Sequence, residues 1–509
     1  MTTSSPVVVG EADLALSDVL DVVAGRPLAL SNDPAVIARL EAGARAVAEH
    51  VARGEEIYGV TTGFGDSCEN RVPGDAAGAL QRNLVRYHGC GVGPVLPDDA
   101  ALAVLVVRLA TLARGLSGVR PVLLRTLEAL VRHRILPRIP WYGSVGASGD
   151  LTPLSYVAAA LCGERTVTFE GREVPAAEAL AACGIEPLVL APKEGLALMN
   201  GTSVMTALGI LAWDRARRLL RWATAITALC ADALTSNRRH FDPRLDAAKP
   251  HPGQRKVAAW LREDLGFDPA AGDPRKRLQD RYSIRCAPHV LGVLSDAVDL
   301  TERILTVELN SANDNPLVDP DTGDVLSGGN FYGGHVAFAM DGLKTAVANA
   351  AGLLDRQMAL LCGAATNNGL PANLVAPGAD AAARHGFKAM QITASALCAE
   401  AMKNTMPASV FSRSTECHNQ DIVSMGTHAA HDCLHVLDAA EPVAAVVTLA
   451  ACQGIDLRED AAPGPGSRRL HAAVRAEIPM VTADRPQDAD IVRLLDLYRS
   501  GRLPVGAPA

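Results

Sequence analysis

The sequence predicts a mainly α-helical protein in which a central bundle of long helices follows a smaller, mixed N-terminal domain. Hydrophobic residues make up 49% of the 509-residue chain but aromatic residues only 4%, and Ala, Leu and Val supply most of the apolar mass. Such a composition favours helix over sheet. From about residue 203 onward, apolar positions recur with helical spacing over stretches of about 20 to 35 residues, against ~11 for a typical globular helix. Helices of this length are typical of a bundle of parallel rods.

The N-terminal domain, residues 1–196, is expected to combine short elements interrupted by Gly and Pro. One helix has a clear start, because Asn32-Asp33-Pro34 supplies a capping side chain followed by a proline at the first helical position. In chain order the pattern predicts a strand at 6–10, a helix at 33–53, a Gly-rich loop at 55–75, helical periodicity over 100–136, and a hairpin followed by a helix at 165–190.

The central bundle is expected to occupy residues 197–460 and a C-terminal part residues 461–509. The segment 456–484 is polar and rich in Pro and Gly, and the last 25 or so residues predict a peripheral helix with a loose tail. The long helices are predicted at 203–236, 289–310, 335–362, 388–404 and 420–454.

Charge and cysteine usage restrict the classes of function. The net charge is −8 with arginines scattered among acidic residues, which argues against a nucleic-acid surface. The eleven cysteines include no CxxC pair, so reduced thiols in a cytoplasmic protein are expected rather than a disulfide or zinc framework. Charged residues interrupt the apolar stretches 339–363 and 435–452, so no membrane span is expected. No motif indicates a metal or a nucleotide.

The most informative segment is GSVGASGDLTPL at residues 143–154, which contains Ala147-Ser148-Gly149. Small residues around the serine let the backbone fold back sharply. In that geometry the Gly149 nitrogen can approach the Ala147 carbonyl carbon. Ring closure and loss of water from Ser148 would then produce an electrophile from ordinary residues. Taken alone, such a string is more often an ordinary turn, so its meaning depends on the rest of the chain.

Five further segments occur with this triplet: YGVTTGFG (58–65), PKEGLALMNGT (192–202), QDRYSIR (279–285), ELNSANDNPL (308–317) and HNQDIVSMG (418–426). Together they resemble the aromatic amino acid ammonia-lyase family, which contains histidine, phenylalanine and tyrosine ammonia-lyases and related aminomutases. The resemblance covers residues 55–455. It implies a 4-methylideneimidazole-5-one (MIO) group formed from Ala147, Ser148 and Gly149, no external cofactor, and a homotetramer whose active sites are shared between chains.

The resemblance also assigns roles in catalysis. Tyr58 matches the catalytic base, which needs either a lowered pKa or help from a hydrogen bond to act near neutrality. Tyr282 matches a tyrosine that positions the amine and the prosthetic ring. Arg285 matches the arginine that binds the substrate carboxylate, for which a planar guanidinium is well suited. Gln279 matches another polar contact. Tyr282 and Arg285 would share one face if their segment is helical.

Further positions match residues that surround the substrate. Asn200 matches an asparagine bonded to the prosthetic ring or the substrate, and Asn315 one near the substrate carboxylate. Phe331 matches an aromatic that packs on the prosthetic group. Gln420 stands where histidine enzymes usually carry glutamate, and with Glu416 it looks like the phenylalanine and tyrosine enzymes. Their spacing would place Glu416 and Gln420 on one helix face.

The pair Tyr87-His88 matches the position that selects the substrate ring, and it equals none of the pairs usual in the family. Two polar tips in an apolar pocket favour a ring that bears a hydroxyl, because such a site rejects an analogue that leaves its polar groups unpaired. The sequence therefore predicts conversion of L-tyrosine to trans-4-coumarate. Histidine and phenylalanine are alternative substrates, and His88 could instead be a core residue away from the substrate.

Three other interpretations of the sequence compete with this one. A tyrosine 2,3-aminomutase of the same family would retain the product and add the amine back at the β-carbon. A fumarase-type helical lyase is disfavoured because its GSSxMPxKxN loop is absent from the sequence. A non-enzymatic helical scaffold would leave the co-occurrence of Tyr58, Ser148 and Arg285 unexplained.

Overall fold

The structure is a computed structural model that describes residues 5–270 and 277–506, and it is mainly helical, as predicted. Two compact units can be separated. Unit 1 gathers residues 1–211, 301–340 and 407–431, and unit 2 gathers 212–300, 341–406 and 432–509. Each unit therefore collects three separate stretches of chain. The three consecutive domains expected from the sequence remain a prediction.

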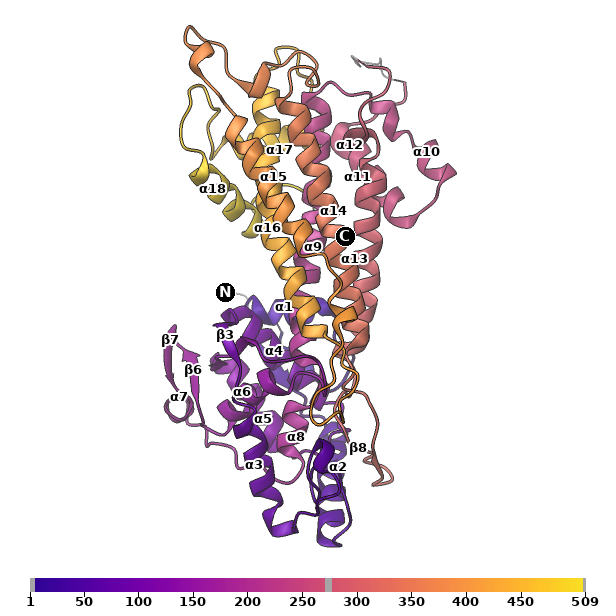
Figure 1. Cartoon of the computed structure of the whole chain (residues 1–509), viewed down its shortest axis with the longest axis vertical. Helices are drawn as coiled ribbons and strands as arrows, with labels where there is room; N and C mark the ends of the chain where they lie inside the picture. The colour runs from indigo at the N-terminus through magenta and orange to yellow at the C-terminus, as the bar shows by residue number, and fades with distance from the viewer. Residues whose placement is uncertain (1–4, 271–276, 507–509) are drawn as a thin grey trace. The chain divides into compact units, whose positions relative to one another are not determined.

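Unit 1 contains the short elements of the N-terminal segment (Figure 1). Asp33 caps the helix that begins at Pro34 by accepting a hydrogen bond from the Ala35 amide at 2.8 Å, as its sequence predicts. The elements are β1 (Val7–Val9), α1 (Leu16–Val23), β2 (Leu28–Leu30), α2 (Pro34–Ala52), α3 (Ala77–Tyr87), β3 (Val92–Val95), α4 (Asp98–Leu112), α5 (Pro121–His133), β4 (Leu136–Pro137), β5 (Pro140–Tyr142), α6 (Leu151–Leu161), β6 (Thr166–Phe169), β7 (Arg172–Pro175), α7 (Ala176–Ala182), α8 (Glu194–Met199), β8 (Leu317–Val318) and β9 (Val325–Leu326).

The strands of unit 1 form four small sheets. β1 and β2 pair in parallel, whereas the pairs β3–β5, β4–β6, β6–β7 and β8–β9 are antiparallel. The hairpin and following helix predicted at 165–190 are confirmed as β6, β7 and α7. The core is centred on α4, whose residues from Ala100 to Leu112 are all buried. A helix that is apolar all round belongs in a protein interior.

The predicted long helices are confirmed as α9 (Ser203–Ala233), α13 (Ala287–Leu309), α14 (Gly334–Cys362), α15 (Lys388–Lys403) and α16 (Gly426–Asp456). Two details differ from the prediction. α15 has 16 residues, fewer than the length expected of a rod in this bundle. α16 begins at Gly426 rather than at residue 420, because Met425, directly before it, has a positive φ of 58° that a right-handed helix cannot contain.

Within unit 2, polar contacts tie the long helices to one another. Arg215 on α9 donates to Glu441 on α16 at 2.8 Å. Gln357 on α14 donates to the Thr227 hydroxyl on α9 at 2.9 Å. The fully buried Lys344 on α14 contacts Asp432 on α16 at 2.9 Å. These contacts fix which faces of the rods meet.

Further helices in unit 2 are α10 (Pro243–Ala248), α11 (Pro252–Leu265), α12 (Tyr282–Arg285), α17 (Pro465–Arg475) and α18 (Asp488–Arg499). α18 confirms the predicted C-terminal helix. α17 lies within the polar, Pro- and Gly-rich stretch 456–484, where the sequence analysis predicts no helix. There a proline takes the first helical position, and Leu470 and Val474 are buried on one face.

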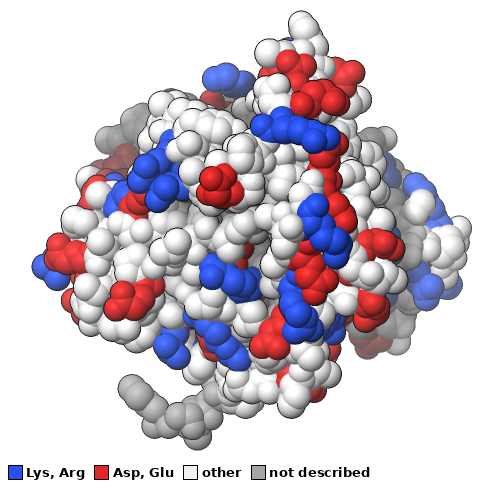
Figure 2. All heavy atoms as spheres, turned by 90° about the horizontal axis from the view of Figure 1, so that it is seen from below, with Lys and Arg blue, Asp and Glu red and all other residues white. Residues whose placement is uncertain are grey.

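Helix α16 is long and apolar enough to cross a membrane by length and composition, with a mean hydropathy of 1.5. Inside this fold, 83% of its most apolar window is buried, as in the core helix of a globular protein. On the face drawn in Figure 2, basic and acidic side chains are interspersed. All eleven cysteines are free thiols.

Candidate active site

A cavity of about 820 Å³ lies within unit 1 and collects most of the residues singled out in the sequence. Its wall combines three separate stretches of chain, which explains why no local pattern could outline it. Ten of the predicted site residues line it: Tyr58, Tyr87, His88, Ala147, Ser148, Asn200, Asn315, Phe331, Glu416 and Gln420.

The triplet at the cavity wall is folded back on itself. Ala147 and Gly149 are registered as bridge partners although only one residue separates them, and Gly149 also pairs with Gly201. Gly149 has φ +71°, and a Cβ at this position would lie 2.2 Å from the Gly201 carbonyl oxygen. Only glycine fits here. The sharp turn predicted around Ser148 is therefore present.

Three helices start around this turn. α6 begins directly after Asp150, whose carboxylate accepts hydrogen bonds from the Met205 amide in the first turn of α9 (2.8 Å) and from the Thr427 hydroxyl in the first turn of α16. The positive ends of helix dipoles thus converge beside the triplet. Asp150 is fully buried, and burial raises the pKa of its carboxyl, an effect that these hydrogen bonds oppose only partly.

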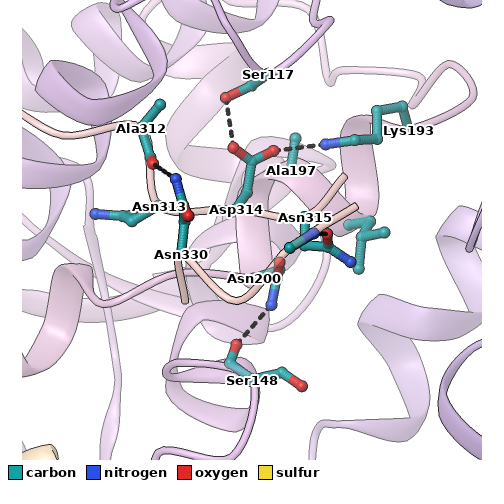
Figure 3. Close-up of polar contacts among 12 residues, drawn as sticks. Ser117, Ser148, Lys193, Ala197, Asn200, Ala312, Asn313, Asp314, Asn315 and Asn330 are labelled. Carbon is teal, nitrogen blue, oxygen red and sulfur yellow. Dashed lines mark hydrogen bonds and ion pairs between the residues drawn. The ribbon is translucent and has the colours of Figure 1, made fainter. Parts of the chain in front are cut away.

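Asn200 connects the triplet to the interior. Its side-chain amide donates to the Ser148 carbonyl oxygen at 2.7 Å (Figure 3). Behind it, the fully buried guanidinium of Arg108 donates to the backbone carbonyl of Asn200 at 2.8 Å and to the Asn313 side chain at 3.2 Å. Burial lowers the pKa of Arg108 to about 10, so the group stays charged at neutral pH. Asn200 is thereby held from two sides.

A buried ion pair supports the neighbouring loop. Lys193 lies 2.5 Å from Asp314, and both side chains are at most 1% exposed. The Ser117 hydroxyl donates to the second carboxylate oxygen of Asp314 at 2.9 Å (Figure 3). The next residue, Asn315, lines the cavity and accepts a hydrogen bond from the Gly328 amide at 2.7 Å. The ion pair therefore fixes the loop that presents Asn315.

Tyr58 lies at the cavity wall with its hydroxyl oxygen 2.8 Å from the Gly65 amide, which donates to it. Burial raises the pKa of Tyr58, the Gly65 amide lowers it, and the negative charge of Glu416 raises it. The net direction is upward, so this phenol relies on its hydrogen bond rather than on a lowered pKa. The Glu416 carboxylate accepts from the Asp66 amide at 3.0 Å, next to the Gly65 amide.

The predicted shared helix face for Glu416 and Gln420 is wrong. Residues 415–420 form a tight loop closed by hydrogen bonds between the Thr415 amide and the Gln420 carbonyl (2.9 Å) and in the reverse sense (3.2 Å). The loop still brings Gln420 to the triplet, because its side-chain amide donates to the Ser148 hydroxyl at 3.1 Å. The positive φ of Glu416 left no signal in the sequence, since glycine is absent from that position.

Tyr87 and His88 end α3 and line the cavity together, with ring centroids 4.4 Å apart. Burial raises the pKa of Tyr87 to about 12, while burial and then the charge of Arg165 lower the pKa of His88 to about 4. Both side chains are therefore neutral at physiological pH. They present a hydroxyl and an imidazole as hydrogen-bonding groups.

Three predicted residues belong to unit 2 and do not line this cavity: Gln279, Tyr282 and Arg285. Tyr282 and Arg285 do share one helical turn, since the Arg285 guanidinium lies 4.5 Å from the centroid of the Tyr282 ring. Tyr282 is 71% exposed. Their roles remain predictions.

Several lining residues carried no sequence signal of their own. They are Phe64, Leu84, Leu151, Leu196, Tyr332, Asn419, Asp421 and Ile422. Six of these eight lie inside the motifs quoted above, and Leu84 and Tyr332 lie within three residues of Tyr87 and Phe331. The motifs therefore located these positions, although no single residue was assigned a role.

The residues present fit an MIO group. The turn brings Ala147 and Gly149 together, and the Ser148 carbonyl oxygen already accepts a hydrogen bond from Asn200. The buried side-chain oxygen Oδ1 of Asn200 has no hydrogen-bond partner in the part of the chain described. Over the same residues, no group of three or more His, Cys, Asp or Glu side chains could hold a metal ion.

A helical fold with a folded-back ASG turn at a polar cavity defines a class of carbon–nitrogen lyases. The chain belongs to the aromatic amino acid lyase family, whose model matches residues 14–476. It is 38% identical to a histidine ammonia-lyase of Bradyrhizobium diazoefficiens over 506 residues, which covers 98% of this chain and 96% of the relative.

Solved structures agree on the fold. The tyrosine aminomutase of Streptomyces globisporus is similar with a TM-score of 0.91 and 36% identity, over 98% of both chains. The histidine ammonia-lyase of Trypanosoma cruzi is similar with a TM-score of 0.89 and 33% identity, over 98% of this chain and 95% of that one.

Proposed function

We propose that the protein eliminates ammonia from an aromatic L-amino acid whose ring carries a hydrogen-bonding group, with L-histidine as the first candidate substrate. One observation carries this proposal: the triplet, the Tyr58 hydroxyl and the polar tips of Tyr87 and His88 line one cavity. Histidine comes before the predicted tyrosine because the relatives that match along almost the whole chain are named histidine ammonia-lyases.

L-Tyrosine is the second candidate. Its support is the structural similarity to a tyrosine aminomutase and the hydroxyl-compatible pair Tyr87-His88. L-Phenylalanine is less well suited, because its unsubstituted ring offers no hydrogen-bond partner to the Tyr87 hydroxyl or the His88 imidazole.

The chemistry would be divided among the residues at the wall. An MIO group formed from the triplet supplies an electrophile for the substrate amine. Tyr58 would take the β-proton at its hydroxyl oxygen, with the Gly65 amide stabilising the phenolate that must form first. Asn200 holds the Ser148 carbonyl. Glu416 would attract the substrate ammonium, and His88 and Tyr87 would orient the ring.

The homotetramer with shared sites is part of the same proposal. Among the described residues, the lining of this cavity includes no arginine or lysine. The resemblance assigns the carboxylate-binding arginine to Arg285, and in this proposal a second copy supplies it. Along α13, Val293, Leu300 and Val307 recur at seven-residue spacing and are 59%, 37% and 69% exposed. Exposed apolar side chains that repeat along one helix support an interface between copies.

The test is a substrate panel. The purified protein is incubated separately with L-histidine, L-tyrosine and L-phenylalanine, and formation of each arylacrylate is followed by absorbance. Chromatography for the β-amino acid in the same samples separates lyase from aminomutase. Ser148→Ala serves as the inactive reference. Ammonia release that survives unchanged in this variant would exclude the proposed class.

A further inference from the structure

His88 lies at the C-terminal end of α3 and lines the cavity. Arg165, the residue before β6, contacts the same end of α3 and has no role in the proposed function so far. Its Nη2 donates to the Val85 carbonyl at 2.8 Å, and its Nη1 donates to the Ser155 hydroxyl at 3.0 Å. Its Cζ lies 4.3 Å from the centroid of the Tyr156 ring. Arg165 thus joins α3 to α6.

Ser155 extends this contact to His88 itself. The side chain is fully buried, and its hydroxyl lies 3.2 Å from the His88 carbonyl oxygen and 2.7 Å from that of Thr152, to which it can donate. Gly89 makes room for the guanidinium, because a Cβ there would lie 2.3 Å from Nη2 of Arg165. Arg165 and Ser155 therefore clamp the C-terminal end of α3 against α6.

The clamp has an electrostatic consequence. The free carbonyls at the C-terminus of a helix normally favour a protonated histidine. Here the Arg165 guanidinium binds the Val85 carbonyl in the last turn of α3, so its positive charge disfavours a second positive charge on His88. Burial, and then the charge of Arg165, lower the pKa of His88 to about 4. The other titratable or charged groups around this end of α3 and its cavity include Tyr58, Arg86 paired with Glu164, Tyr87, Cys90, Tyr156, Glu416 and Asp421.

We propose that Arg165 is a positioning residue, which holds the end of α3 and keeps His88 neutral so that its imidazole can hydrogen-bond the ring of the substrate. A neutral imidazole has one donor and one acceptor nitrogen, so it can pair with a phenol hydroxyl or with either nitrogen of a substrate imidazole. A protonated one has two donors and would repel a cationic ring. This inference rests on the proposed function, in which His88 contacts the ring.

The first test needs no activity. Hydrogen–deuterium exchange at the imidazole Cε1 carbon, read by mass spectrometry across a pH series, gives the pKa of His88 in the whole protein. We expect a value near 4 in the natural protein, a higher value in Arg165→Gln, and a low value kept in Arg165→Lys, which retains the charge. Arg172→Gln, which removes an exposed arginine on β7, is the matched control. An unchanged value in Arg165→Gln overturns the inference whatever the substrate is.

The second test uses the preferred substrate of the panel. If only the neutral form binds, KM doubles at the pH that equals the pKa of His88. This pH should be higher in Arg165→Gln than in the natural protein by the rise found in the exchange experiment, whereas Arg172→Gln should match the natural protein, and kcat should change less than KM. A doubling pH that is the same in Arg165→Gln and in the natural protein contradicts the inference while the lyase activity stands. A natural protein that acts on none of the three amino acids contradicts the proposed function instead, and the exchange experiment still decides the state of His88.

Discussion

Glu416→Gln is the most informative single change for the role of Tyr58. The hydroxyl of Tyr58 and the carboxylate of Glu416 are joined through two adjacent amides, those of Gly65 and Asp66, at 2.8 and 3.0 Å. Neighbouring amide nitrogens lie within about 3.6 Å, so the two groups are at most about 9 Å apart. The negative charge of Glu416 raises the pKa of Tyr58. Removing it must therefore lower that pKa.

The magnitude follows from Coulomb's law. For charges about 8 Å apart, effective dielectric constants of about 20 to 80 give roughly 0.5 to 2 kcal/mol. Glu416→Gln removes this repulsion, so the pKa of Tyr58 falls. If the phenolate is the base, the alkaline rise of kcat moves to lower pH.

The assay is kcat at saturating substrate from pH 7 to 11, which reports the enzyme–substrate complex. The amine of the substrate is common to both proteins, so its titration cancels in the comparison. Glu69 is an exposed acid in the loop 55–75 that carries Tyr58, so Glu69→Gln controls for a general charge effect and should leave the midpoint of the kcat profile in place. A midpoint that stays fixed or moves upward in Glu416→Gln would refute the assignment of Tyr58 as the titrating base.

Three further outcomes are expected. Asn200→Ala removes the amide that donates to the carbonyl of the triplet serine, and ammonia release should fall by about 10²-fold. Lys193→Met leaves the buried Asp314 without its partner and should lower the free energy of unfolding, measured in urea, by about 3–5 kcal/mol. The change Lys403→Met at an exposed ion pair should lower it by less than about 1 kcal/mol. His88→Leu should raise kcat/KM for L-phenylalanine relative to L-histidine about tenfold or more, measured in one competitive assay.

The long helices and the sharp turn at the Ala147-Ser148-Gly149 triplet could be predicted from the sequence. Periodicity located α9, α13, α14 and α16 because each keeps an apolar face over many turns. The turn around Ser148 was readable because only small residues tolerate it. α17 was missed because its starting proline and glycine look like loop residues in isolation.

Parts of the cavity could not be read from the sequence, since they depend on long-range contacts. The left-handed conformation at Glu416 is imposed by the surrounding loop and breaks the helical spacing assumed for Gln420. The link from Arg165 to His88 joins residues 77 positions apart through a hydroxyl of a third segment. Ring preference is likewise undecided by residue types alone, because the tyrosine prediction rested on two polar tips that suit an imidazole as well.

The most direct measurement is the mass of the proteolytic peptide that contains residues 143–154, taken from a preparation that releases ammonia. We expect this peptide to be lighter than its sequence by two water molecules, and the matching peptide of Ser148→Ala, which has no hydroxyl to lose at that position, to carry the mass of its own sequence. An active preparation in which that peptide carries its full, unmodified mass would contradict the self-made electrophile on which the proposed chemistry depends.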